Sequence, residues 1–257
     1  MKLCTFEVST HLGRHQRAGA CKTGVIVDLN FAVAWYMAQS GEPEPQRLAD
    51  ALVPSTMPAF LRAGLRAMHT AEELFLGAGP HPADWWRNNP APRGPNDETL
   101  VYQADEVRLR APLPGCRFAI TAGTGDDLPS PGPDALWTPQ IAAVGGSYVN
   151  PGSARRDLAG YALRLACGPH SAMGPYLVTP NDIKSPGSIS VSMWINGEEW
   201  MRADAGALEG VLDARGGIRP GEIVTADLAG PAPLKPGDEV RLESDLLGAL
   251  RNRVAQG

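Results

Sequence analysis

The stretch of residues 188–198 constrains the fold more than any other part of the chain. Its turn-forming pair Asn196-Gly197 follows apolar residues at every second position, namely Ile189, Val191, Met193 and Ile195. Alternation with a period of two is typical of a strand with one buried face. Asn and Gly both tolerate the positive φ angles of a type I′ turn, so the stretch predicts a strand that enters a tight hairpin.

Further strands are predicted in the second half of the chain. The segments 223–225 and 239–243 are rich in β-branched and apolar residues, and Pro236-Gly237-Asp238 predicts a turn before the second of them. Between residues 106 and 111, apolar residues alternate with arginines, which predicts a half-buried strand. The chain contains 29 glycines and 24 prolines, a content that favours short strands and turns over a helical bundle.

Residues 1–78 predict a small α/β domain. An opening strand starts near Leu3, and a second strand over 23–29 contains Asp28, whose carboxylate is expected to cap a helix over 29–38. The spacing of apolar residues predicts two further helices, over 46–52 and 57–76. Two histidines and two arginines close together indicate an exposed basic turn, at His11, Arg14, His15 and Arg17.

The remaining residues divide into a linker and a main domain. Residues 79–105 are rich in Pro and Gly, cannot form a regular ladder of hydrogen bonds and are therefore expected to be a linker. Its Trp85-Trp86 pair is expected to pack onto one of the domains, because two exposed indoles would be costly. Residues 106–257 are expected to form the main domain, built mostly from strands.

Charge and composition exclude several classes of protein. The net charge is -5, so no basic surface is expected for nucleic acid or an anionic membrane. No apolar run is long enough to span a bilayer and the chain starts without a signal-peptide pattern, which predicts a cytoplasmic protein. The four cysteines are far apart in sequence and are expected to be free thiols, at positions 4, 21, 116 and 167.

Six short segments, each typical of a strand or a turn, follow one another along the last 98 residues. They are Gly160-Tyr161, Gly174-Pro175-Tyr176-Leu177-Val178-Thr179-Pro180, Trp194-Ile195-Asn196-Gly197-Glu198, Pro220-Gly221-Glu222-Ile223-Val224, Lys235-Pro236-Gly237-Asp238-Glu239-Val240 and Leu247-Gly248-Ala249-Leu250-Arg251-Asn252. In this order and spacing they resemble the fumarylacetoacetate hydrolase superfamily. The resemblance implies an α+β fold, with a small α/β amino-terminal domain followed by a mixed β-roll or sandwich. It also implies a homodimer that pairs through the main domains.

The resemblance implies a changed acid/base site. In the family, a Tyr-Arg-Asp-His segment supplies a catalytic His, and a Glu three residues later orients it. Here Asp127 falls at the His position and Ser130 at the Glu position. A carboxylate with an ordinary pKa of about 4 is a weak base near neutrality unless burial or a neighbour raises its pKa. Asp126 and Asp127 are thus either a coupled acid/base pair or part of a solvated loop, and Thr124 is a candidate substrate contact.

The resemblance also implies that the family's metal ligands are lost. Family members hold Mg²⁺ or a similar hard cation with a Glu-x-Glu strand and a later Asp. The corresponding positions here are Thr138, Gln140 and Ala166, and hard cations need anionic oxygen ligands. No metal and no cofactor are therefore expected. Arg164 or His170 is expected near the place of the family's substrate-facing Lys.

Several candidate residues keep a structural alternative. His170 is either a replacement base or a loop residue, and Gln140 either orients a carbonyl or is a polar strand residue. Trp137 either fills the space of the lost metal or belongs to the core. The remaining candidate substrate contacts are Trp200, Met201 and Asp227. In the family a polar amide often stands at the position of Met201, so a ligand more apolar than fumarylacetoacetate is expected.

Two functions from different classes remain. The first is a metal-independent enzyme of specialised metabolism that acts on a small 1,3-dicarbonyl or 2-oxo compound. Its enolate-like intermediate would lead to isomerisation, cyclisation, decarboxylation or C–C cleavage. The second is a catalytically inactive homologue that serves as a binding or partner subunit. An enzyme should keep converging polar groups at its site, whereas an inactive homologue should fill that site with apolar side chains.

Overall fold

The computed structural model describes residues 1–11, 13–76, 92–113, 120–130, 132, 135–146, 158–215 and 218–256. The chain divides into two compact units, Met1–Arg108 and Leu109–Gly257. Strand β5, Arg108–Arg110, lies at the division and is shorter than the strand predicted over 106–111. The domain boundaries expected at 78 and 106 stay a prediction, and the pair Trp85-Trp86 lies outside the described residues.

The first unit contains an antiparallel sheet in the order β1-β2-β3-β4. Its strands are β1 Lys2–Thr10, β2 Gly13–Lys22, β3 Val25–Asp28 and β4 Val101–Gln103. Strand β4 lies within the segment expected to be a linker. The predicted basic turn is wrong, because His15 and Arg17 lie on β2, opposite Val8 and Phe6 of β1. The polar first half of β2 carries no apolar alternation, and pairing with β1 makes it a strand.

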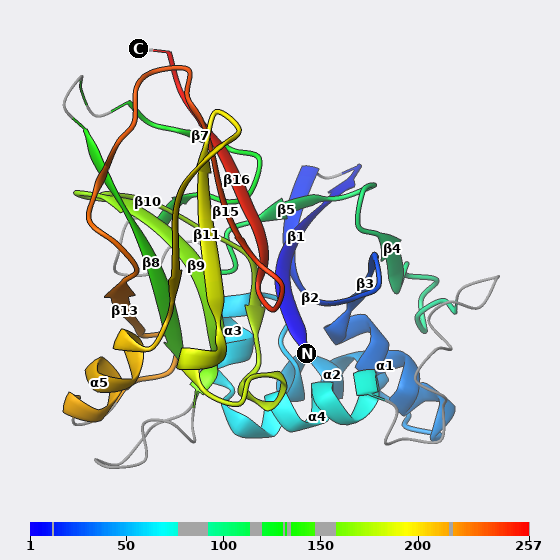
Figure 1. Ribbon diagram of the computed structural model, residues 1–257. Coiled ribbons are helices and arrows are strands. Elements are labelled where there is room, and N and C mark those ends of the chain that lie inside the picture. Colours follow the sequence, from blue (N-terminus) through cyan, green and yellow to red (C-terminus); the bar gives the residue numbers. More distant parts are fainter. Residues whose placement is uncertain are drawn as a thin grey trace. The chain divides into compact units, whose positions relative to one another are not determined.

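Four helices follow or precede these strands and lie together in Figure 1. They are α1 Leu29–Gln39, α2 Pro45–Leu52, α3 Met57–Arg62 and α4 Leu65–Leu76. The prediction for Asp28 is confirmed, since its carboxylate accepts a hydrogen bond from the Phe31 backbone N–H at 3.1 Å. The single helix predicted over 57–76 is wrong. It breaks at Gly64, where a φ of 76° leaves the helical region.

Asp28 also forms an ion pair with Arg17 of strand β2. Its side chain is fully buried and receives hydrogen bonds from the Arg17 guanidinium, one of them at 3.0 Å from Nη2 to Oδ1. Burial raises the pKa of the Asp28 carboxyl, even though Arg17 and the backbone N–H donors act to lower it. The guanidinium lies 3.7 Å from the centre of the Phe31 ring. The ion pair thus joins β2 to the start of α1.

The second unit contains two sheets. The first has the antiparallel order β13-β8-β9-β10, with β6 parallel to β10 and β14 beside β8. Its strands are β13 Ile223–Asp227, β8 Leu136–Gly145, β9 Leu158–Cys167, β10 His170–Val178, β6 Ile120–Ala122 and β14 Ala232–Pro233. Short helices complete the unit, namely η2 Pro180–Asp182, η3 Pro186–Ser188 and α5 Ala207–Ala214.

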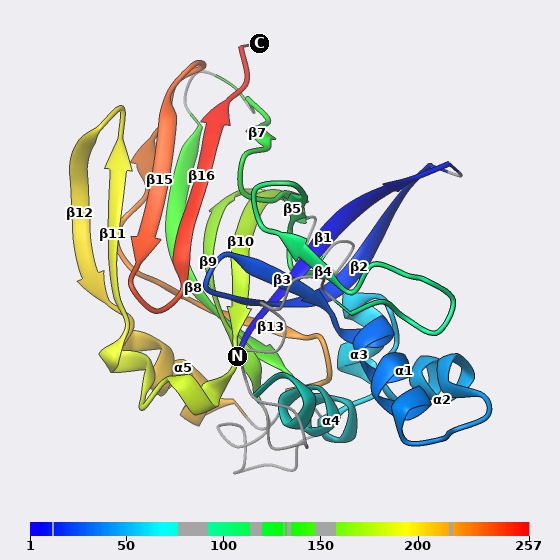
Figure 2. The ribbon, with the colours of Figure 1, turned by 90° about the vertical axis from the view of Figure 1, so that its right-hand side faces the viewer.

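The second sheet has the order β12-β11-β15-β16-β7, and Figure 2 shows its strands side by side. They are β12 Glu198–Asp204, β11 Ser190–Ile195, β15 Glu239–Ser244, β16 Gly248–Val254 and β7 Asp127–Leu128. One apolar cluster joins both sheets and includes Trp137, Ile141 and Leu163 of the first and Met193 and Leu242 of the second. Burying each such side chain contributes about 1.5–3 kcal/mol. The α+β fold class expected from the sequence is confirmed.

The hairpin between β11 and β12 follows the sequence prediction. Asn196 and Gly197 have φ angles of 51° and 87°, the positive values that a type I′ turn requires at both positions. The Asn196 side chain also donates to Asp238 Oδ1 at 2.9 Å and accepts from the Glu239 backbone N–H at 2.9 Å. The turn therefore ties the β11–β12 hairpin to the start of β15.

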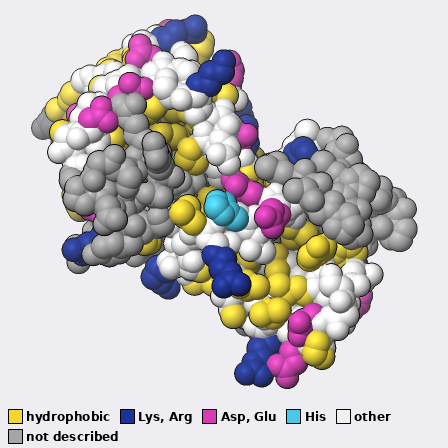
Figure 3. All heavy atoms as spheres, turned by 90° about the horizontal axis from the view of Figure 1, so that it is seen from below, with side chains coloured by type: hydrophobic (Ala, Val, Ile, Leu, Met, Phe, Trp, Pro, Cys, Tyr) yellow, Lys and Arg dark blue, Asp and Glu magenta, His cyan; other side chains and the backbone are white. Residues whose placement is uncertain are grey.

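Surface and thiol chemistry agree with the composition. None of the described helices has the length and apolar character needed to cross a membrane. Cys4, Cys21 and Cys167 are free thiols, and Cys116 lies outside the described residues. On the face drawn in Figure 3, acidic and basic side chains are interspersed among apolar ones.

We expect Asn196→Ala to lower the free energy of unfolding by about 1–3 kcal/mol, because the variant loses two hydrogen bonds and strains a positive-φ position. Urea denaturation measures this loss. The matched control is Ser192→Ala in the same hairpin, for which a change within about 0.5 kcal/mol is expected. Equal losses in the two variants would contradict the role given to this turn.

Candidate functional site

The three positions that align with the family's metal ligands lie on one face of the first sheet. Strands β8 and β9 pair so that Thr138 lies opposite Ala166 and Gln140 lies opposite Arg164. Because side chains alternate along a strand, these residues face away from Trp137, which is fully buried in the core. The structure therefore brings together residues that the sequence places on two separate segments.

A row of three polar side chains crosses this face. Asp227 of β13 lies opposite Gln140, and the Gln140 Nε2 donates a hydrogen bond to Asp227 Oδ1 at 2.7 Å. On the other side, Arg164 Nη1 donates to Gln140 Oε1. Each end of the Gln140 amide thus has a partner of matching chemistry, which fixes its orientation. We call these residues the Asp227–Gln140–Arg164 row.

The row holds a positive charge in a largely buried place. Arg164 is 8% exposed. Burial lowers the pKa of its guanidinium, and the Asp227 carboxylate acts in the opposite direction. An arginine side chain starts from so high a pKa that it stays protonated near neutrality. Arg164 therefore places a permanent cation beside Thr138, Gln140 and Ala166, the positions that the resemblance aligns with the family's metal ligands.

The residues of this face do not fit a divalent cation. The positions equivalent to the ligands offer a hydroxyl, an amide and a methyl group, and the Gln140 carbonyl oxygen already accepts from Arg164. Hard cations prefer several anionic oxygens, and a neighbouring guanidinium repels them. Across the described ranges, no group of three or more His, Cys, Asp and Glu side chains has a metal-binding arrangement. Arg164 thus lies where a divalent cation would be repelled.

The two candidate acids have different surroundings. The Asp126 carboxylate accepts from the Gly123 backbone N–H at 2.8 Å and lies 3.4 Å from Arg110 Nη1. The Asn252 side chain donates to the carbonyl oxygens of Gly123 and Asp126, at 2.7 and 2.8 Å. Asp126 thus closes its own turn. Asp127 is exposed and lies opposite Arg253 on the second sheet. The interpretation of Asp126 and Asp127 as a coupled acid/base pair is therefore not supported by a hydrogen bond between their described carboxyl groups.

His170 and Trp137 do not join the row. His170 starts β10 opposite Cys167, and by alternation it faces the side opposite to Met173, which lies across from Arg164. Trp137 is fully buried and belongs to the apolar cluster of both sheets. Their surroundings favour the structural alternative for Trp137 and separate His170 from Arg164. Their roles in binding or catalysis stay predictions.

The remaining candidate contacts lie on the second sheet and its loops. The Thr124 hydroxyl accepts from the Arg251 backbone N–H at 3.1 Å and lies 3.4 Å from the Ala249 carbonyl oxygen, which ties its loop to β16. Met201 lies opposite Met193 and packs against the core, whereas Trp200 on the edge strand is 39% exposed. The expectation of an apolar ligand at Met201 stays a prediction.

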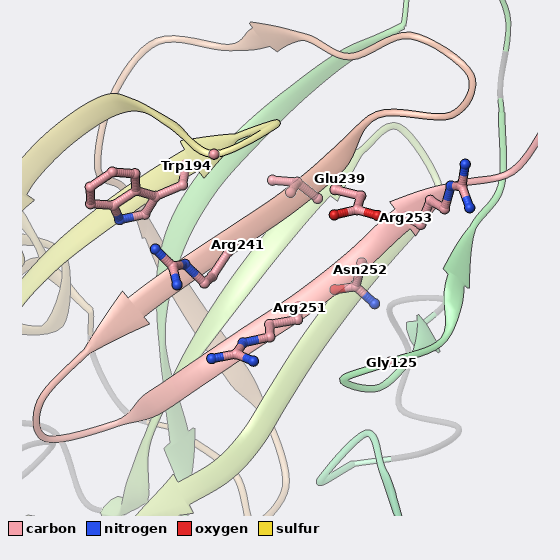
Figure 4. Close-up of a pocket in the computed structure, with 9 residues that line it drawn as sticks. Gly125, Trp194, Glu239, Arg241, Arg251, Asn252 and Arg253 are labelled. Atoms are coloured by element: carbon pink, nitrogen blue, oxygen red, sulfur yellow. The ribbon is translucent and has the colours of Figure 1, made fainter.

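A pocket on the second sheet was not predicted from the sequence (Figure 4). Its volume is about 420 Å³, and its lining includes Trp194, Arg241, Arg251, Asn252 and Arg253. The sequence signal that could have predicted it is the alternation of Arg251 and Arg253 with their neighbours in the segment 248–254. This pattern is typical of a strand with a basic outer face. That strand, β16, was not among the predicted strands.

We expect the purified chain to retain no stoichiometric Mg²⁺, Mn²⁺ or Ca²⁺, because Arg164 and the neutral side chains beside it disfavour a hard cation. Metal analysis of protein prepared without chelator, followed by titration with Mn²⁺, measures this property. Arg164→Gln serves as the comparison, since it removes the repelling charge but adds no carboxylate. One bound divalent ion per chain at Thr138 and Gln140 would show that the interpretation is wrong.

Similarity to solved structures shows the fold. No family model matches the chain, and no curated protein matches it. Among solved structures, the chain is similar to maleylpyruvate hydrolase from Sphingobium sp. SYK-6, with a TM-score of 0.67, 18% identity and 100% of both chains covered. It is similar to fumarylacetoacetate hydrolase from psychrophilic Exiguobacterium antarcticum, with a TM-score of 0.67, 16% identity and 100% of both chains covered.

A third similar structure is an isomerase. It is 2-hydroxyhepta-2,4-diene-1,7-dioate isomerase from Mycobacterium marinum, with a TM-score of 0.58, 14% identity, and 99% of this chain and 98% of that chain covered. At these identities the likeness concerns the fold. The resemblance of the strand and turn segments is thereby confirmed for the fold. The chain has the fold of the fumarylacetoacetate hydrolase superfamily.

Proposed function

We propose that the chain is an enzyme that acts on a small 1,3-dicarbonyl or 2-oxo compound, by C–C cleavage or isomerisation, without a divalent metal. The names of the similar structures, two hydrolases and an isomerase, support this class of reaction. The observation that carries the proposal is the Asp227–Gln140–Arg164 row, which holds a cation beside the positions aligned with the family's metal ligands.

The guanidinium of Arg164 has the properties needed to stabilise an enolate-like intermediate. When such an intermediate forms, negative charge develops on a carbonyl oxygen of the substrate. A fixed cation with several N–H donors stabilises that charge most when it is already oriented and largely desolvated. Gln140 and Asp227 orient Arg164, and its low exposure keeps water away from the charge. In this proposal Gln140 and Asp227 are positioning residues.

One structure of this fold has been determined with a metal ion. Maleylpyruvate hydrolase from Sphingobium sp. SYK-6 has been crystallised with manganese(II) and pyruvate, and its chain is 18% identical to this one. In the present proposal, Arg164 supplies positive charge in place of such a metal. Thr138 lies next to it on the same face and is the proposed hydroxyl contact to substrate. No cofactor takes part, and the proposed assembly is a homodimer.

The direct test is exchange of the acidic C–H hydrogen of oxo compounds in deuterated water, followed by NMR. A panel of acylpyruvates, 2-oxo acids and 1,3-diketones covers the class, and exchange reports enolisation whatever bond changes next. We expect EDTA to leave the rate unchanged and Arg164→Gln to lower it by about 10²-fold or more, while Arg164→Lys keeps part of it.

Matched controls separate charge from folding in this test. Arg202→Gln removes an exposed arginine that pairs with Glu199 on the edge strand β12, so its exchange rate should equal that of the unchanged chain. Circular dichroism and the thermal midpoint show whether each variant is folded. A folded Arg164→Gln protein with full activity, or activity abolished by EDTA, would overturn the metal-free proposal.

Asp127 is the proposed general acid/base, on the basis of its alignment with the family's histidine. We expect Asp127→Asn to lower the exchange rate by about 10²-fold or more, because the amide cannot accept the proton. Asp126→Asn is the matched comparison. It should mainly lower stability, by about 1–2 kcal/mol, because that carboxylate closes its own turn. Normal activity of folded Asp127→Asn would remove this residue from the mechanism and make His170 the next candidate.

A catalytically inactive homologue is the second candidate function. One observation favours it, since both polar ends of Gln140 are satisfied within the row. Such a residue stabilises a sheet without any ligand. The same panel decides between the two functions. A folded protein that exchanges no compound, but binds one of them or a protein partner, would support the binding role.

A further inference from the structure

The exposed face of the second sheet carries a second cluster of cations. We propose that it binds a compact organic anion, with a carboxylate or phosphate group held between Arg241 and Arg251. The site is separate from the Asp227–Gln140–Arg164 row, which lies on the first sheet. The pocket there has a volume of about 420 Å³. Gly125 and Gly197 also line it.

Pairing of three strands builds the cluster. Trp194 of β11 lies opposite Arg241 of β15, and Arg241 lies opposite Arg251 of β16. The alternate residues Leu242 and Leu250 are buried in the core, so the two arginines project outward. Figure 4 shows Trp194, Arg241 and Arg251 on the same side of three adjacent strands. Their spacing is therefore set by backbone pairing.

The two arginines carry unbalanced charge. Like charges directly opposite each other on neighbouring strands destabilise a sheet. Arg241 is partly compensated, because Glu243 lies 3.4 Å away and the Trp194 ring lies 5.0 Å from its guanidinium carbon. Among the described residues, no carboxylate forms an ion pair with the Arg251 side chain. An anion between the two guanidinium groups would remove this repulsion.

The surroundings define the size and charge of the ligand. Arginine donors match the oxygens of a carboxylate or phosphate, and two guanidinium groups bind such a group better than one. Glu239 and Glu243 precede and follow Arg241 on the same face of β15, so acidic groups flank the cationic centre along the strand. They repel a long polyanion such as nucleic acid. The site therefore fits one compact anionic group.

The test is an NMR titration of the full chain at low ionic strength with inorganic phosphate and with succinate. Signals of the Trp194 indole and the arginine Nε–H groups report binding at this face. We expect dissociation constants of about 0.1–10 mM for at least one of the two anions. Phosphate alone, succinate alone or both would each support the site and identify the favoured class of anion.

Three variants make the titration decisive. Arg251→Gln should weaken binding by about tenfold or more, without lowering the thermal midpoint, because it also removes the like-charge pair. Arg202→Gln, on the same sheet but paired with Glu199, should change the affinity less than about twofold. Arg164→Gln should leave it unchanged, which separates this site from the one proposed for catalysis.

Several results would overturn the proposal. They are the absence of any shift with both anions, equal affinity in the Arg251→Gln protein, and shifts confined to residues outside this face. A change in oligomeric state caused by Arg251→Gln, with no anion binding, would assign the face to contact between copies of the chain instead. Size-exclusion chromatography with light scattering detects that outcome.

Discussion

The antiparallel pairing of β8 with β9 is the constraint on which the main unit depends. Its register places Trp137 and Leu165 in the core and Gln140 beside Arg164 on the opposite face. A shift of β9 by one residue would bury the guanidinium of Arg164 among apolar side chains, and a shift of β8 would expose Trp137 instead, because strand side chains alternate. The cost of an unpaired buried charge makes such a register unfavourable. Core packing and the polar row therefore select the same register.

The polar row places a guanidinium beside Thr138 and Gln140. A hard cation needs several carboxylates, whereas a guanidinium is covalently part of the chain and needs only acceptors that orient it. The Gln140 side chain accepts a hydrogen bond from Arg164 through its oxygen and donates one to Asp227 through its N–H. The arrangement holds a positive charge beside neutral side chains. A substrate oxygen that gains negative charge would find there an oriented partner, which is the basis of the proposed chemistry.

The second sheet uses arginine in a different way. Its outer face exposes Arg241 and Arg251 next to each other, whereas Arg164 is largely buried and held by a row of partners. The turn around Asp126 is held to this sheet by hydrogen bonds of the Asn252 amide and the Thr124 hydroxyl. These contacts give Thr124 and the Asp126 backbone a part in holding this turn, and the roles expected for the two residues at a site stay predictions. They leave Asp127 on the surface, with its side chain accessible to solvent.

The sequence alone determined the features that depend on local backbone preference. The positive φ angles at Asn196-Gly197, the Asp28 helix cap and the alternation along β11 follow from residue type and near neighbours. Tertiary structure alone decided which polar residues meet. Gln140 and Asp227 are 87 residues apart, and the register of the two paired strands β8 and β13 brings them into contact. Strand β2 likewise depends on its pairing with β1, since its polar first half has no apolar alternation of its own.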